Sequence, residues 1–230
     1  MDKLNIILLI ILFVLSLIYI THYIFLNKTN NKYEIMQKYK PTQKDVELLY
    51  ISKYPSVITG EVEDWFIFDK KDKIDTSKLT KKVLDESLSK ICHRFSLVKN
   101  YNIITHQKNY NTKIKYENNT RHSLVILKGE LSVLLFNPEQ FNKIDFIDSN
   151  KKNLISKSSM YDKTKKNLKD AKYMEIKLHK EQILLIPYKW LYCFSCKEKS
   201  QIIHVNSESI FTLPIKMIND LNLSYRPSDL

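Results

Sequence analysis

The longest apolar stretch of the chain lies near its N-terminus. Residues 4–26 read LNIILLIILFVLSLIYITHYIFL and include no Asp, Glu, Lys or Arg. A helix that rises ~1.5 Å per residue crosses the ~30 Å hydrocarbon layer of a bilayer with ~20 such residues. The stretch exceeds the ~7–15 apolar residues of a signal peptide, and no small-x-small cleavage pattern follows it. We therefore predict a transmembrane anchor over residues 1–26, and a cleaved signal peptide is the alternative.

The pattern changes after this stretch. Residues 27–40 are polar, have no apolar period and predict a juxtamembrane linker. Residues 41–54 and 76–88 place apolar side chains at helical spacing, so each range predicts a short helix. Residues 55–60 predict a strand that ends at Gly60. A folded domain is therefore expected over residues 41–230.

From Ser123 onward, short apolar runs of the kind typical of β-strands follow one another. The runs 124–128 and 131–136 flank Gly129-Glu130, a two-residue turn signal that predicts a β-hairpin. Two further pairs are expected, 176–178 with 183–186 and 192–196 with 201–205, and a helix is expected from Leu213. Many short antiparallel strands predict a sandwich or barrel. Residues 142–172 carry nine lysines with weak periodicity and predict a long surface excursion from that barrel.

The composition is that of a globular protein, but the charge is unbalanced. The 37 Lys and Arg exceed the 25 Asp and Glu, for a net charge of +12, which suggests an anionic partner. Most of this excess lies in two segments, +4 in residues 27–44 and +5 in residues 142–172. Only Arg94, Arg121 and Arg226 are arginine, the residue that reads bases and phosphates best, so nucleic acid is not the favoured partner. A nucleic-acid binder would use the lysine-rich excursion, with Lys151, Lys152, Lys165 and Lys166.

The position of the charge predicts a topology. Lys3 before the span is offset by Asp2, whereas four lysines follow it: Lys28, Lys32, Lys38 and Lys40. The positive-inside rule then places the C-terminal domain on the cytosolic side, with these lysines at the membrane surface. Three cysteines are a small and odd number, which does not suit a secreted disulfide framework and agrees with a cytosolic domain. The bias toward Lys, Asn and Ile is typical of an AT-rich genome such as that of a large DNA virus.

Three segments in order resemble a known family. Residues 54–65 (YPSVITGEVEDW), 124–138 (LVILKGELSVLLFNP) and 183–192 (ILLIPYKWLY) are similar to motifs of the Jumonji-like cupin family. Members of this family are oxygenases that use iron(II) and 2-oxoglutarate. The resemblance extends from about residue 41 to residue 217. It implies a mainly β fold, a double-stranded β-helix with flanking helices.

The resemblance also implies where the metal would lie, and the chain departs from the family there. Such oxygenases hold iron with two His and one carboxylate. With a one-residue insertion, the first two ligand positions fall on Lys115 and Glu117; without it they fall on Tyr116 and Asn118. The distal histidine position falls on Tyr192.

A second departure concerns the cosubstrate. The position of the family lysine that holds the 2-oxoglutarate carboxylate is Leu131 in this chain. Because two imidazoles and this cation are missing, we predict a degenerate member with no cofactor. The alternative is an active hydroxylase or demethylase that binds Fe(II) and 2-oxoglutarate through an unorthodox ligand set. His122 and His204 are the histidines expected nearest the barrel mouth, so that set would be Glu117, His122 and His204.

Other candidate residues have simpler interpretations. Cys193 and Cys196 form a C-x-x-C, but a strand points residues three apart to opposite faces, so we predict buried structural thiols. Trp65 and Trp190 are expected in the core. The favoured interpretation is a membrane-anchored, non-catalytic cupin-like module with a binding or structural role, from a virus or a protist. Its expected partners are the lipid bilayer, through residues 4–26, and another protein.

Overall fold

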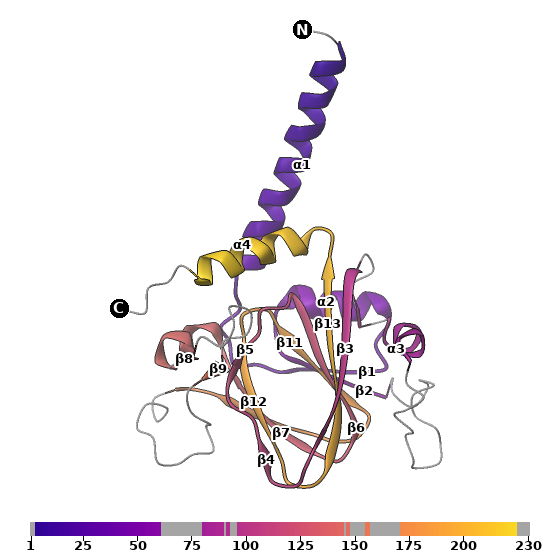
Figure 1. Cartoon of the computed structure of the whole chain (residues 1–230), viewed down its shortest axis with the longest axis vertical. Helices are drawn as coiled ribbons and strands as arrows, with labels where there is room; N and C mark the ends of the chain where they lie inside the picture. The colour runs from indigo at the N-terminus through magenta and orange to yellow at the C-terminus, as the bar shows by residue number, and fades with distance from the viewer. Residues whose placement is uncertain are drawn as a thin grey trace.

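The computed structural model describes residues 3–60, 80–89, 91–92, 96–144, 146–147, 155–156 and 171–224. Several sequence predictions lie outside these residues. They include the core position of Trp65, the start of the predicted helix at 76–79 and most of the excursion 142–172 with its lysines. Figure 1 shows a β-barrel from which the first helix projects, with the other helices packed around the barrel.

The N-terminal helix α1 covers Lys3–Asn27 and is apolar over nearly its whole length. It is long and apolar enough to cross a membrane, and none of its most apolar part is buried against the protein. The short helix α2 (Gln43–Ser52) begins at Thr42, which forms a capping box with Asp45, and ends at Lys53 in a left-handed conformation. The remaining helices are α3 (Lys81–Leu88), the 3-10 helix η2 (Pro138–Lys143) and α4 (Thr212–Ser224).

The strands form two sheets. The first has the order β1 (Met36–Tyr39), β2 (Ser56–Thr59), β11 (Gln182–Pro187), β6 (Arg121–Lys128), β13 (Ser200–Ser209) and β3 (Ser96–His106). The second has the order β10 (Met174–Leu178), β7 (Leu131–Phe136), β12 (Leu191–Cys196), β5 (Lys115–Tyr116), β9 (Ile155–Ser156) and β8 (Phe146–Ile147). β4 (Tyr110–Asn111) also pairs with β12. All described pairings are antiparallel except that of β1 with β2.

The three predicted hairpins are wrong in the same way. β6 pairs with β11 and β13, whereas β7 pairs with β10 and β12, so the turn at Gly129 joins the two sheets. β10 and β11 are likewise in different sheets, as are β12 and β13. β6 already has a hydrogen-bonded neighbour on each side, so β7 cannot also pair with it. A turn signal specifies that the chain reverses, but not with which strand it then pairs.

This alternation between sheets defines the fold. The chain crosses from one sheet to the other between β5, β6 and β7 and again from β10 through β13, which is the arrangement of a double-stranded β-helix, as in cupins and jelly rolls. The prediction of a mainly β, cupin-type barrel with flanking helices is therefore confirmed. Gly129 makes the crossing possible: its φ is +80°, and a Cβ there would lie 2.5 Å from Ser200 Oγ.

Apolar side chains fill the space between the sheets. This interior core includes Leu124, Leu131, Leu184 and Trp190, all almost fully buried. A second core lies between the first sheet and helices α2 and α3, and a third covers the outer side of β7 and β12. Trp190 is thus a core residue, as predicted.

The predicted linker is partly structured. Residues 36–39 form the edge strand β1, which runs parallel to β2 with Met36 opposite Ser56. All four side chains of β1 are exposed, so no apolar alternation marks the strand in the sequence. β3 was not predicted for a similar reason: it is an edge strand, and its exposed and half-buried side chains follow no regular alternation.

Candidate functional site in the barrel interior

The three residues matched to the family's metal ligands lie next to one another. Lys115 on β5 is directly opposite Tyr192 on β12. Glu117 follows β5, and its backbone N–H donates to Trp190 O at 2.9 Å while its carbonyl accepts from the Lys189 N–H. The second sheet therefore carries Lys115, Glu117 and Tyr192 as one group, and Glu117 and Tyr192 are buried.

The first sheet adds two histidines to this group. His122 lies on β6 and His204 on β13, and these strands are adjacent, with His204 opposite Leu124. The ring of His122 lies 5.2 Å from the ring of Tyr192, so the two sheets meet here across the interior. We call Lys115, Glu117, His122, Tyr192 and His204 the interior polar cluster.

Three members of the cluster, Glu117, His122 and His204, contact one another in a line. Glu117 Oε2 pairs with His122 Nδ1, and His122 Nε2 lies 3.3 Å from His204 Nδ1. The other Glu117 oxygen, Oε1, accepts the backbone N–H and the side-chain amide of Asn119, each at 2.7 Å. Glu117 thus uses both of its oxygens, whereas His122 Nδ1, despite its contact with Glu117, and His204 Nε2 are buried without a well-formed hydrogen bond.

Burial and the neighbouring charges set the charge states of Glu117 and His204. Burial opposes the charged form of Glu117, but the charge and hydrogen bond of His122 and the hydrogen bonds of Asn119 outweigh it, and the pKa of Glu117 lies below its ordinary value. Burial and then the charges of His122 and Lys115 hold the pKa of His204 well below its ordinary value. Glu117 is therefore an anion and His204 is neutral near pH 7.

The remaining two members have shifted pKa values as well. Burial lowers the pKa of Lys115, and the nearby Glu117 carboxylate opposes that effect. Burial and then Glu117 raise the pKa of Tyr192 well above its ordinary value. Tyr192 is therefore a neutral phenol, which is a poor replacement for an imidazole ligand.

These side chains do not fit an iron site of the family type. A facial triad needs three donors that face one point, but Glu117 and His204 contact opposite nitrogens of the same His122 ring. Within the described ranges, no group of three or more His, Cys, Asp or Glu is placed to hold a metal ion. Leu131 is 1% exposed and belongs to the apolar interior core, so it presents no cation to 2-oxoglutarate. The structure thus gathers Glu117, His122 and His204, but in a line.

His106 is a neighbour of the cluster that the sequence did not single out. It ends β3, stacks on Tyr110 with 4.4 Å between ring centroids, and lies 5.2 Å from the Phe194 ring. Its buried Nε2 has no hydrogen-bond partner, and burial and then the charge of Lys115 lower its pKa. Only the pairing of β3 with β13 brings it here, and no local pattern encodes that pairing.

The cysteines and the juxtamembrane lysines are placed as follows. Cys193 and Cys196 are free, buried and members of different cores, as expected from opposite faces of a strand, and burial raises the pKa of Cys193 to about 12. Lys38 pairs with Asp45 at 3.3 Å, and Lys40 lies over the Tyr39 ring. Lys28 directly follows α1, and its carbonyl accepts from Lys53 Nζ.

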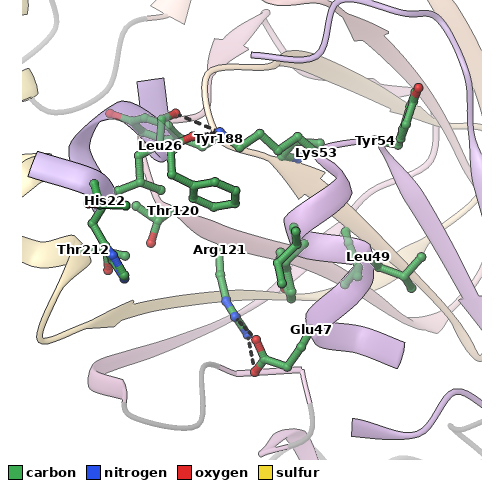
Figure 2. A pocket seen from close by; sticks show the side chains of 16 residues that line it. His22, Leu26, Glu47, Leu49, Lys53, Tyr54, Thr120, Arg121, Tyr188 and Thr212 are labelled. Atoms are coloured by element: carbon green, nitrogen blue, oxygen red, sulfur yellow. Dashed lines mark hydrogen bonds and ion pairs between the residues drawn. The ribbon is translucent and has the colours of Figure 1, made fainter. Parts of the chain in front are cut away.

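A separate cavity lies at the C-terminal end of α1. It has a volume of about 380 Å³, and its wall comes from α1, α2 and the adjoining end of the barrel. Figure 2 shows Lys53 reaching toward the end of α1, and Arg121 paired with Glu47 on another side of the cavity. Leu26, Leu49 and Tyr188 contribute apolar surface to the wall.

Comparison with known proteins finds a distant structural likeness and no family match. No family model and no curated protein matches the chain. Similar solved structures include hydroquinone 1,2-dioxygenase from Sphingomonas sp. TTNP3, at 12% identity, covering 53% of this chain and 65% of that one with a TM-score of 0.35. The cupin domain of Schizosaccharomyces pombe Cnp3 matches at 11% identity over 55% of this chain and 65% of that one, with a TM-score of 0.33.

A dTDP-4-dehydrorhamnose 3,5-epimerase from Sulfolobus tokodaii matches at 15% identity over 56% of this chain and 61% of that one, with a TM-score of 0.32. This chain therefore spans less than two thirds of each of these three structures. At such values the likeness concerns the fold alone. The chain is a cupin-fold protein with an N-terminal helix long and apolar enough to span a membrane.

Proposed function

We propose that the chain is a membrane-anchored, non-catalytic binding module built on a degenerate Jumonji-like cupin barrel. The observation that carries the proposal is that Glu117 contacts one nitrogen of His122 and His204 contacts the other. Lys115 and Tyr192 add a cation and a phenol at two positions where the family has imidazoles. The barrel is retained, and the chemistry of its interior is changed. We also propose that the chain originates from an AT-rich viral genome.

The anchoring part of the proposal is supported by the surface around α1. Figure 1 shows α4 lying across the foot of α1, and the rings of His22 and Phe211 are in contact there, with centroids 5.3 Å apart. Exposed apolar side chains gather on the strands and helix at this end of the barrel: Leu97, Val98, Ile210, Met217 and Ile218. These side chains are suited to face a bilayer that α1 enters.

The topology is proposed from charge. The lysines that follow α1 favour a cytosolic domain, with Lys28, Lys32, Lys38 and Lys40 near anionic headgroups. Alkaline carbonate extraction of membranes tests the anchor, because a spanning helix stays in the pellet. Protease digestion of sealed vesicles then tests the orientation: the domain should be cleaved from the cytosolic side.

The non-catalytic part is tested on the full chain in detergent. We expect less than stoichiometric iron or zinc after loading, no more than in the His122→Ala variant, and no succinate from 2-oxoglutarate. Stoichiometric metal that His122→Ala removes, together with succinate release, would overturn the proposal. That result would favour the alternative, an oxygenase that rearranges Glu117, His122 and His204 around Fe(II).

A further inference from the structure

The cavity at the foot of α1 lies where a bilayer surface meets the protein. Thr21, His22, Phe25 and Leu26 form one of its walls, and they belong to the last two turns of the apolar helix. If α1 spans the membrane as proposed above, these turns lie at the boundary between hydrocarbon and headgroups. The cavity then opens at the depth where the acyl chains and phosphates of lipids are found.

Apolar side chains of α2 and the barrel form much of the remaining wall, beside the polar Glu47, Thr120 and Arg121. Leu49 of α2 and Leu185 of β11 are both almost fully buried and belong to the core under α2. Tyr188 and Pro187 continue the wall along the end of the barrel. The volume of about 380 Å³ lies within the ~300–1,000 Å³ of pockets that bind small molecules.

Cations gather at one side of this apolar space. Lys53 Nζ donates to the backbone carbonyls of Phe25, Leu26 and Lys28, so it caps the C-terminal end of α1. Lys189 Nζ donates to the side chain of Asn27 at 2.7 Å, which brings a second ammonium to the same helix end. Burial and then the charges of Lys189 and Lys28 lower the pKa of Lys53 to about 8.

A bound anion would relieve the repulsion among these lysines. Arg121 does not need such an anion, because its guanidinium is paired with Glu47. The lysines at the end of α1 therefore require a negatively charged group, and the cavity beside them requires an apolar one. A ligand with one negative headgroup and one hydrocarbon chain satisfies both.

We infer that the cavity holds one acyl chain of an anionic phospholipid, whose phosphate lies against Lys28, Lys53 and Lys189. This inference rests on the proposed membrane anchoring, since only then is the lipid present at the cavity mouth. The bound lipid would fix the barrel against the bilayer. It would also make attachment sensitive to the lipid composition of the membrane.

The experiment measures lipid retained by the full chain in detergent, by native mass spectrometry with added phosphatidylglycerol or phosphatidylcholine. We expect one phosphatidylglycerol per chain. Because a lysine near headgroups contributes ~1 kcal/mol, replacing Lys53 or Lys189 by Met should weaken that binding about five-fold and leave phosphatidylcholine unchanged. Two such variants are used because Lys53 also caps α1.

A matched pair of variants locates the lipid. Thr21→Trp fills the cavity from α1, whereas Ile24→Trp places the same bulk on the same helix at a residue that does not line the cavity. Thr21→Trp should lose the retained lipid and Ile24→Trp should keep it. Equal retention by both variants, or equal binding of the two lipids by the wild type, would overturn the inference. Carbonate extraction of the same variants distinguishes failure of the lipid inference from failure of the proposed anchoring, since loss of the anchor releases the chain from membranes.

Discussion

Replacing Gly129, where the chain crosses from β6 to β7, should destabilise the protein by more than the backbone strain of a non-glycine residue alone. The chain contains two glycines, Gly60 and Gly129, with φ of +78° and +80°. Alanine in this left-handed region costs ~1–2 kcal/mol from backbone strain. The two positions therefore share one cost and differ in their surroundings.

The surroundings predict a large difference between the two substitutions. The three atoms nearest to a Cβ on Gly60 would all belong to the ring of Tyr39, the first at 2.4 Å, and that side chain is exposed and free to rotate away. A Cβ on Gly129 would lie 2.5 Å from Ser200 Oγ and 2.9 Å from the backbone carbonyl of Lys199. Since the carbonyl can move only if β12 and β13 move, we expect Gly129→Ala to cost ~1–3 kcal/mol more than Gly60→Ala.

Thermal unfolding of the full chain in detergent measures this difference. A change of 1 kcal/mol shifts the Tm of a chain of this size by ~2–4 °C, so the two variants should differ by several degrees. Replacing Ser200 by Ala removes the hydroxyl but leaves the carbonyl, and Gly129→Ala should therefore cost less, though not nothing, in that background. Equal Tm values for Gly60→Ala and Gly129→Ala would contradict the crossing of the chain between the sheets at this turn.

The interior polar cluster and the thiols give further predictions. Glu117→Gln should destabilise the chain by ~1–3 kcal/mol, because its amide keeps one oxygen for Asn119 but places an NH2 group against His122 Nδ1, whereas the exposed Glu175→Gln should change the Tm little. The unfolded chain protonates His204 below about pH 6.5 and the native chain does not, so stability should fall by ~1.4 kcal/mol per pH unit as the pH falls further. His204→Asn should flatten the Tm profile between about pH 5 and pH 6.5, and parallel profiles for His204→Asn and wild type would refute the assignment. The three thiols are buried, so a disulfide reagent should label them only after denaturation, and rapid labelling of the native chain would contradict their burial.

Local patterns were enough to locate most elements. The capping residues Thr42 and Asp45 begin α2 where helical periodicity indicates, and the apolar runs around Gly129 correspond to β6 and β7. Elements with exposed side chains were missed, because an edge strand such as β1 has no buried face to impose alternation. Pairing was not encoded locally either: a strand whose two faces are both buried looks the same in a hairpin and in a crossing between sheets.

The candidate site depended on a different kind of information. Resemblance to a family pointed to Lys115, Glu117 and Tyr192, and no periodicity would have singled them out. His122 and His204 are 82 residues apart in sequence, and their contact follows from the pairing of β6 with β13. His106 joins them only through the long pairing of β13 with β3. Contacts that depend on strand order stay invisible until the topology is known.

The contrast between Leu131 and the interior polar cluster bears on what the barrel does. At Leu131 the interior is apolar and fully packed, as expected where a position serves only the core. At Glu117 and His122, by contrast, a carboxylate and an imidazole remain buried in contact, although well-packed apolar residues of similar volume are often as stable or more so. Packing alone therefore gives no reason for the cluster. The unsatisfied Nε2 atoms of His106 and His204 lie in the same region, and each of them is a hydrogen-bonding group that a small polar ligand would satisfy. The proposed binding module therefore predicts a small polar ligand at the end of the barrel interior near Lys115.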